Sequence, residues 1–271
     1  MRSVKYLIAA GAATLMSTAA FAADMAIAPP PAYAPPPVVE DFGGWYLRGD
    51  IGFSNQRVSR LNNALDAAAI SSQQNLSFNT AGIFGLGAGY RFNSWFRADV
   101  TGEYRGNSQF FGTDYLTYPG PAYGVDTYHA TKSEWVVLGN AYVDLGTWWC
   151  MTPFIGAGVG GARVSIANFT DINTPTGGVA YGDNVSKWNL AWALHAGVAY
   201  KVSPNFTVEL AYRYLDMGDG LTGDLRTYNG VNAIVNPTTF KGITSHDLKL
   251  GVRWDLTSPQ PVYQPPLIRK G

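Results

Sequence analysis

The sequence predicts an all-β fold: an eight-stranded antiparallel transmembrane β-barrel with long extracellular loops, short periplasmic turns and Pro-rich disordered termini. Three observations lead to this prediction. Segments of about ten residues alternate between apolar and polar side chains with period two, which is the pattern of a strand. The apolar face begins and ends with aromatic residues, whereas the other face carries charges at its centre. The connections alternate between short and long, as they do in outer-membrane barrels.

Eight segments carry the strand pattern, in this order: 44–58, 77–92, 95–106, 133–145, 153–169, the two halves of 187–217, and 245–256. In the first, Arg48 and Asp50 oppose an apolar face that begins at Trp45. In the second, alternate residues from Phe78 to Phe92 lie on one face. A two-residue turn leads into the third, whose alternation is the clearest in the chain, and the fourth alternates in the same way.

The fifth segment is glycine-rich, so its facing depends on Arg163 and Ser165, which select the lumen side. The sixth and seventh form a hairpin around a tight turn at 203–205. In the eighth, four charged residues alternate with five apolar ones. An even number of strands lets the barrel close, so that no backbone group is left unpaired in hydrocarbon.

The alternation predicts two sets of side chains. The lumen charge network comprises Arg48, Asp50, Arg97, Asp99, Glu103, Arg105, Asp144, Arg163, Lys201, Glu209, Arg213, Lys249, Arg253 and Asp255. The lipid-facing aromatic girdle comprises Trp45, Phe53, Phe78, Tyr90, Phe96, Tyr104, Trp135, Trp188, Trp192, Tyr200, Phe206, Tyr212, Tyr214 and Trp254. Because an eight-stranded barrel is only just wide enough for its side chains, the mixed charges predict a lumen plugged by ion pairs. A narrow water-filled channel is the alternative.

The lengths of the connections predict the orientation. The short connections are 93–94, 146–152 and 203–205, and the long polar ones are 59–76, 107–132, 170–185 and 217–242. Short turns in such barrels are periplasmic and long loops extracellular, so both termini are expected in the periplasm. A soluble barrel of lipocalin type shares the strand period. The aromatic residues at both ends of the apolar face and the rule of short and long connections favour the membrane barrel.

The two ends of the chain are expected to lie outside the barrel, which spans 43–256. Residues 1–22 have the basic, apolar and small-residue regions of a signal peptide; a membrane anchor is the alternative, which the shortness of the apolar run disfavours. Residues 23–42 form a Pro-rich periplasmic linker and 257–271 a Pro-rich periplasmic tail. Downstream of the signal peptide no apolar run reaches about 18 residues, which excludes a helical membrane protein.

The charge balance excludes nucleic acid as a partner, and the cysteine content excludes an internal disulfide. Removing the signal peptide takes Lys+Arg from 19 to 17 against 19 acids, so the mature chain is close to −2 and has no basic footprint for nucleic acid. The single cysteine, Cys150, cannot form an internal disulfide, and with no histidine nearby in sequence it is interpreted as an inert interfacial thiol.

Three stretches resemble the OmpA-like/opacity-type family of small outer-membrane β-barrels, often labelled "porin family", of Gram-negative bacteria. Residues 44–52, GWYLRGDIG, are similar to its opening strand, 210–218, LAYRYLDMG, to its seventh, and 245–254, SHDLKLGVRW, to its last. The resemblance covers about 43–256 and implies an outer-membrane location. Family members usually end on an aromatic residue that the barrel-assembly machinery recognises, whereas here fifteen residues follow Leu256.

The histidines invite a catalytic interpretation that the strand geometry opposes. Ser245, His246 and Asp247 are adjacent, and neighbouring residues of a strand point to opposite faces, so they cannot form a relay with one another. His129, expected at the end of a long loop, and His195, expected on the lumen face, lack metal-ligand spacing with His246. Asp216, Asp219 and Asp224 show no calcium-loop pattern and are interpreted as a solvated loop. We therefore expect no enzyme, cofactor or metal site.

The predicted function is that of a structural outer-membrane β-barrel, which supports envelope integrity and surface contact. A small porin-like diffusion channel is one alternative. A surface adhesin or ligand-binding barrel that acts through its loops is another, because the loop from Phe110 to Tyr128 is rich in Tyr and Phe. The expected partners are outer-membrane lipid, lipopolysaccharide, the barrel-assembly machinery and a host or environmental ligand at the loops. The sequence does not define an oligomeric state.

Overall fold

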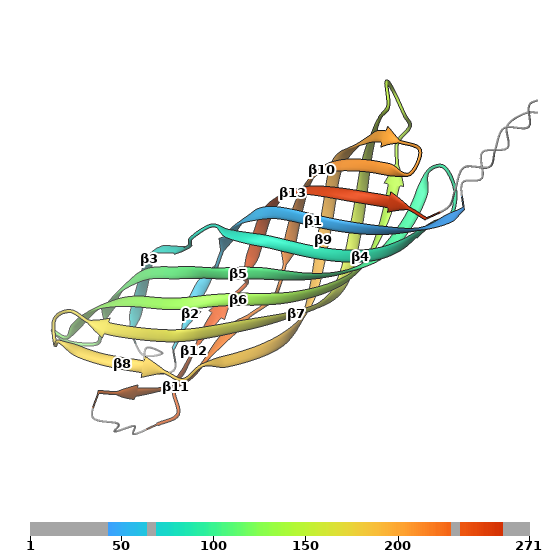
Figure 1. Ribbon diagram of the computed structural model, residues 1–271. Coiled ribbons are helices and arrows are strands. Elements are labelled where there is room, and N and C mark those ends of the chain that lie inside the picture. Colours follow the sequence, from blue (N-terminus) through green and yellow to red (C-terminus); the bar gives the residue numbers. More distant parts are fainter. Residues whose placement is uncertain (1–42, 64–68, 229–233, 257–271) are drawn as a thin grey trace, which may run out of the picture. The chain divides into compact units, whose positions relative to one another are not determined.

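The computed structural model describes residues 43–63, 69–228 and 234–256 (Figure 1). The chain divides into two units, residues 1–39 and 40–271, and every described residue belongs to the second. The predicted signal peptide, Pro-rich linker and Pro-rich tail lie outside the described residues. Within the described ranges, no helix has the length and apolarity needed to cross a membrane.

The described part of the second unit is built from strands. Their bounds are β1 Gly44–Arg57, β2 Arg60–Asn62, β3 Ile70–Phe78, β4 Ala81–Arg91, β5 Phe96–Thr117, β6 Tyr123–Asp144, β7 Met151–Asn173, β8 Gly178–Gly182, β9 Val185–Ser203, β10 Phe206–Asp216, β11 Gly220–Thr227, β12 Pro237–Lys241 and β13 Thr244–Asp255.

Eight of these strands close a barrel. The antiparallel pairings run β1–β4–β5–β6–β7–β9–β10–β13, and β13 pairs with β1 from Tyr46↔Asp255 to Arg57↔Thr244. Figure 1 shows these strands as a tilted ring, with β1 and β13 side by side although they lie at opposite ends of the chain. Closure supplies each strand with a neighbour on both sides, as hydrocarbon requires. The predicted eight-stranded antiparallel barrel is confirmed.

The two ends of the barrel differ. At one end, here called the turn end, residues 92–95, 145–150 and 204–205 connect neighbouring strands. At the other end the chain continues into the extension, residues 58–63, 69–80, 107–133, 166–185, 217–228 and 234–243. The extension contains β2, β3, β8, β11 and β12 together with the far parts of β5, β6 and β7 (Figure 1).

The long connections at this end contain strands over much of their length. β5 and β6 continue their pairing to Thr117↔Tyr123, deep into the predicted loop 107–132, and β3 adds to the other side of β5. Beyond the lipid belt both faces of a strand can be polar, so the period-two hydrophobic signal disappears although the backbone pairing persists. In β5, Phe110 and Asp114 both point inward, whereas Phe111 and Thr113 both point outward.

Candidate functional site

The interior of the barrel holds a balanced set of charges, which we call the charge network. Its cations are Arg48, Arg91, Arg97, Arg105, Lys132, Arg213, Lys249 and Arg253, and its anions are Asp50, Asp99, Glu103, Glu134, Asp144, Glu209, Asp247 and Asp255. Each cation has an acidic partner within the network. This pairing matters because an uncompensated charge removed from water is strongly destabilising.

The middle of the network crosses the lumen. Arg213 of β10 donates to Glu103 of β5 at 2.8 and 2.6 Å, and its Nε donates to Asp247 Oδ2 at 2.9 Å. Arg105 donates to the two oxygens of Asp247 at 2.8 Å each, and Lys249 pairs with Glu103. Bidentate guanidinium–carboxylate pairs fix both distance and orientation, so this layer joins opposite walls rigidly.

Nearer the turn end, aromatic rings enclose the charges. Arg48 donates to Asp50 at 2.9 Å and to Asp99 at 2.8 Å. The Arg97 guanidinium lies 4.3 Å from the ring centroid of Tyr142 and 4.8 Å from that of Phe154. Cation–π contacts in a desolvated setting offset part of the cost of burying the guanidinium.

Nearer the extension, the network meets an apolar region. Lys132 pairs with Glu134, which also accepts a hydrogen bond from Gln56 Nε2 at 3.2 Å. The Lys132 ammonium lies 4.3 Å from the ring centroid of Phe78. This contact marks the boundary between the charge network and the apolar residues on its extension side.

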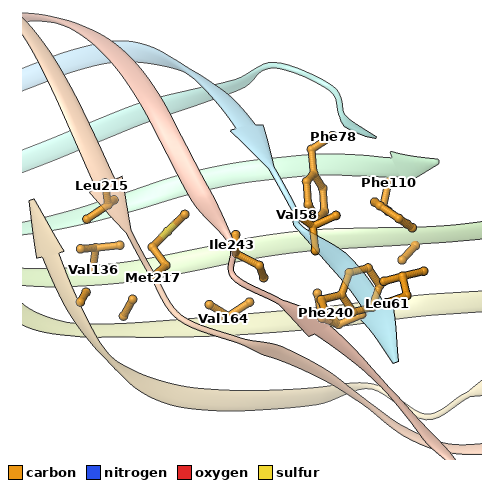
Figure 2. Close-up of a cluster of buried hydrophobic side chains, with 14 of the residues drawn as sticks. Val58, Leu61, Phe78, Phe110, Val136, Val164, Leu215, Met217, Phe240 and Ile243 are labelled. Carbon is orange, nitrogen blue, oxygen red and sulfur yellow. The ribbon is translucent and has the colours of Figure 1, made fainter. Parts of the chain in front are cut away.

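On the extension side of that boundary, the interior holds a cluster of apolar side chains, here called the apolar plug. It consists of Val58, Leu61, Phe78, Phe110, Tyr128, Ala130, Val136, Leu138, Ala162, Val164, Ile166, Phe169, Ala191, Ala193, Leu215, Met217, Leu225, Phe240 and Ile243. Figure 2 draws 14 of these side chains, among them Phe78, Phe110 and Phe240, which converge from several strands. The Phe110 and Phe240 rings meet edge to face at 4.9 Å between centroids. Ion pairs and packed hydrocarbon thus occupy successive levels of the interior.

The apolar plug was not predicted. A signal for it exists in the run Trp135-Val136-Val137-Leu138, because a continuous apolar stretch indicates a strand that is covered on both faces. Val136 and Leu138 point into the plug, whereas Trp135 and Val137 are exposed on the outer face. Lys132, Glu134 and Arg91 of the charge network were also missed, because the first two lie in or beside a predicted loop and Arg91 stands at a strand end.

One residue predicted for the lumen, Arg163, lies elsewhere. Arg163 is exposed on the outer face of β7, directly opposite Trp135 on one side and Trp188 on the other. Its neighbours Ala162 and Val164 enter the plug, and an apolar interior offers a guanidinium no partner. Lys201 lies on the inner face as predicted, opposite Thr207, but at the open turn end, where it is exposed and makes no ion pair with any described residue. The remaining residues predicted for the lumen are buried or half-buried inside the barrel.

Phe78 is a correction to the predicted aromatic girdle. It is buried in the plug, with its ring 5.0 Å from that of Phe110, because the strand breaks at Asn79 and Thr80 and the facing changes across the break. The other predicted girdle residues are exposed or half-buried on the outer face: Trp45, Phe53, Tyr90, Phe96, Tyr104, Trp135, Trp188, Trp192, Tyr200, Phe206, Tyr212, Tyr214 and Trp254.

The three histidines lie in three different environments. His195 is buried inside the barrel, with Nε2 3.2 Å from Asn140 Oδ1. His246 faces outward and its Nδ1 is 2.6 Å from the Tyr212 hydroxyl, whereas Ser245 and Asp247 face inward. His129 belongs to β6, not to a loop, and packs edge to face on Phe111 at 5.2 Å. No serine–histidine–aspartate relay forms among residues 245–247.

A polar cavity of about 870 Å³, the extension cavity, lies between β2, β3, β5 and β12. Its wall includes the buried carboxylate of Asp114, which accepts hydrogen bonds from Ser71 Oγ at 2.7 Å and Gln73 Nε2 at 3.1 Å. Arg60, Thr238 and the ring of Tyr128 also line it. Hydroxyl, amide, carboxylate and aromatic groups thus converge on one space, which is typical of a small-molecule site.

Two carboxylates stand opposite each other near this cavity. Asp114 of β5 pairs in register with Asp126 of β6, and both are buried. Burial raises the pKa of Asp126, and the nearby Asp114 carboxylate raises it further, although a hydrogen bond from Asn173 Nδ2 at 2.7 Å acts in the opposite direction. The extension therefore holds two buried carboxylates side by side, and the pKa of one of them, Asp126, is raised.

A closed ring of antiparallel strands, apolar outside and ion-paired inside, defines a small transmembrane β-barrel of the outer-membrane type. The chain belongs to the outer membrane protein β-barrel domain family, which it matches over residues 8–255. This match confirms the family resemblance and the outer-membrane location inferred from the sequence.

Several relatives are similar to this chain. An uncharacterized Brucella abortus protein is 32% identical over 75% of this chain and 78% of its own length. The outer membrane protein PagN of Salmonella typhimurium is 30% identical over 65% of this chain and 75% of its own. A putative adhesin of Rickettsia felis is 28% identical over 92% of this chain and 98% of its own. Among solved structures, Neisserial surface protein A is 18% identical over 79% of this chain and 97% of its own, with a TM-score of 0.42.

Proposed function

We propose that this outer-membrane barrel acts at the cell surface through its extension, as an adhesin or ligand-binding protein. In this proposal the extension faces outward and the turn end faces the periplasm, as the length rule for connections predicts. The observation that carries the proposal is the placement of the charge network and the apolar plug between the extension cavity and the turn end. Function must then be sought on the extension rather than along the lumen.

The surface of the extension supports this proposal. Its exposed large side chains include Ile70, Tyr115, Tyr123, Tyr181 and Tyr228. Tyrosine supplies large contact area at low entropic cost together with a hydrogen-bonding hydroxyl, and it is enriched at recognition surfaces for that reason. The similarity to a putative adhesin over most of both chains points the same way.

The lining of the extension cavity suggests a ligand chemistry. Amide and hydroxyl groups can serve a ligand rich in hydroxyls, and the buried Asp114 carboxylate opposes an anionic one. Because Arg60 and Asp114 both line the cavity, its charges balance, and we infer that it takes an uncharged polar group.

The other two functions considered from the sequence account for fewer features of the molecule. A diffusion channel would require water to pass both the ion pairs and the packed aromatic rings of the plug. A purely structural role in the envelope needs the barrel wall alone, and leaves the exposed aromatic residues and the cavity of the extension without a use.

The proposal is tested by removing the β5–β6 tip of the extension, which carries Tyr115, Tyr123 and the cavity residue Asp114. Residues 113–127 are replaced by Asn-Gly, which joins the register pair Gly112 and Tyr128 through a tight turn. Non-adherent bacteria that display the full chain are expected to adhere to cultured epithelial cells and immobilised matrix proteins, and bacteria that display the shortened chain are not.

A heat-dependent gel shift verifies that the shortened chain still forms a barrel. As a matched control, Trp149→Ser removes an aromatic side chain that is 90% exposed, but at the turn end, and should leave adherence unchanged. Equal adherence of the full and shortened chains would refute the proposal.

A further inference from the structure

A second polar cavity, the vestibule, opens at the turn end with a volume of about 470 Å³. Its lining includes Arg91, Asp144, Thr152, Lys201, Thr207 and Arg253. The vestibule therefore lies at the opposite end of the barrel from the extension cavity. Its volume is in the range of small-molecule sites.

Two cations of the vestibule flank one hydroxyl. Thr207 of β10 stands directly opposite Lys201 of β9 on one side and Arg253 of β13 on the other. Directly opposed residues of an antiparallel pair share a face and lie about 4.5–5.5 Å apart at Cα. The three side chains thus form one row along the inner wall.

The charges of the vestibule are not balanced. Arg91 is paired with Asp255 at 3.1 Å, and Arg253 with Glu209. The Asp144 carboxylate is used by Arg97, whose Nε lies 3.2 Å away. Lys201 has no ion pair among the described residues, so one positive charge remains beyond the balanced charge network.

A buried donor in the same row lacks an acceptor. Arg253 is only 5% exposed, and its Nε makes no hydrogen bond with any residue of the described part. A buried guanidinium N–H without an acceptor is costly, and buried donors in native proteins generally have a partner. An oxyanion would supply both an acceptor for Arg253 Nε and a negative charge for Lys201.

We propose that the vestibule binds a small oxyanion, a phosphate or carboxylate group, held by Lys201 Nζ and Arg253 Nε with the hydroxyls of Thr207 and Thr152 beside it. Charge-assisted hydrogen bonds to an oxyanion would satisfy the orphaned Arg253 donor and balance Lys201. A cation would instead meet an uncompensated positive charge. This site is independent of the surface function, because it lies at the other end of the barrel and shares no lining residue with the extension cavity.

The test uses the full chain, labelled with nitrogen-15, refolded in detergent micelles and titrated with inorganic phosphate at constant ionic strength. Saturable changes are expected in the backbone amide signals of Lys201 and Thr207. Lys201→Gln should weaken phosphate binding by about tenfold, equivalent to about 1.4 kcal/mol. Lys187→Gln removes an exposed lysine from the other end of the same strand and should bind phosphate as the natural chain does.

Two results would overturn the proposal. One is that sodium chloride at matched ionic strength produces the same signal changes as phosphate, which would mean general screening. The other is that Lys201→Gln binds phosphate with unchanged affinity while its spectrum shows a folded barrel. Arg253 is left intact in the test because its bond to Glu209 belongs to the charge network.

Discussion

Arg213 and Glu103 join opposite walls of the barrel through two hydrogen bonds, from Nη1 to Oε1 at 2.8 Å and from Nη2 to Oε2 at 2.6 Å. Their strands, β10 and β5, stand four places apart in the ring of eight. The pair therefore spans the lumen instead of following the wall. Because both side chains are buried, this single contact occupies the space through which water would have to pass.

Breaking this pair should destabilise the barrel strongly. Arg213→Met is expected to lower the free energy of unfolding by about 3–5 kcal/mol, because Glu103 and Asp247 lose a buried partner. When Arg213→Met is combined with Glu103→Gln, the loss in free energy of unfolding should be smaller than the sum of the two single losses, with a coupling energy of about 1–3 kcal/mol. Urea unfolding in lipid vesicles measures all three variants.

The matched control is Lys241→Met. It breaks the 2.8 Å pair with Asp219, which is partly exposed at the extension, and should cost less than about 1 kcal/mol. Strict additivity of the Arg213 and Glu103 substitutions would mean that the pair does not act as a unit.

Arg163 should behave as a residue at the edge of the lipid belt. It lies between Trp135 and Trp188 on the outer face, where a long basic side chain can reach the interface. Arg163→Leu is expected to change the free energy of unfolding by no more than about 1 kcal/mol, whereas Arg105→Leu inside the network should cost about 3–5 kcal/mol. Equal losses for the two variants would place Arg163 in the lumen after all.

The acidic pair of the extension predicts a dependence on pH. The pKa of Asp126 is raised in the folded state, chiefly by burial, so its charged form opposes folding. Stability is therefore highest when Asp126 is protonated, and falls as pH rises from its unfolded pKa through its raised folded pKa. Asp126→Asn keeps an oxygen for the Asn173 bond and should stabilise the extension at pH 7, with a benefit that disappears at acidic pH. Proteolysis of the β5–β6 tip across pH checks this expectation, and a variant no more resistant than the natural chain at pH 7 would contradict it.

Gln73 acts as a strand partner for β2. Its side chain accepts from Leu61 N at 2.8 Å and donates to Leu61 O at 2.7 Å. Gln73→Ala should therefore speed hydrogen exchange of the Leu61 amide while amides of the eight-strand ring keep their protection. An unchanged exchange rate at Leu61 would show that β2 is held by its pairing with β12 alone.

The strands predicted most accurately from the sequence are those with lipid on one face and charged side chains on the other. Arg48 and Asp50 point inward while Trp45 and Phe53 point outward, because the bilayer outside and the ion pairs inside impose opposite chemistry on the two faces. The hydrophobic pattern of β13 and the third predicted strand follows from the same contrast.

Prediction failed where that contrast is absent. Arg163 was assigned to the wrong face because the glycine-rich strand around it carries no hydrophobic signal and the lumen there is apolar. Phe78 was misplaced because a two-residue break changes the facing, which depends on a backbone feature and not on composition. The convergence of Phe110 with Phe240 depends on contacts between distant strands, which a single sequence does not specify.

The central claim is that the interior is closed and that function belongs to the extension. It is tested most directly by single-channel recording of the full chain refolded in a planar lipid bilayer, after a heat-dependent gel shift has verified the folded barrel. The account predicts a silent bilayer at all applied voltages. Stable and reproducible unitary steps would contradict it, because ions would then be passing both the charge network and the apolar plug.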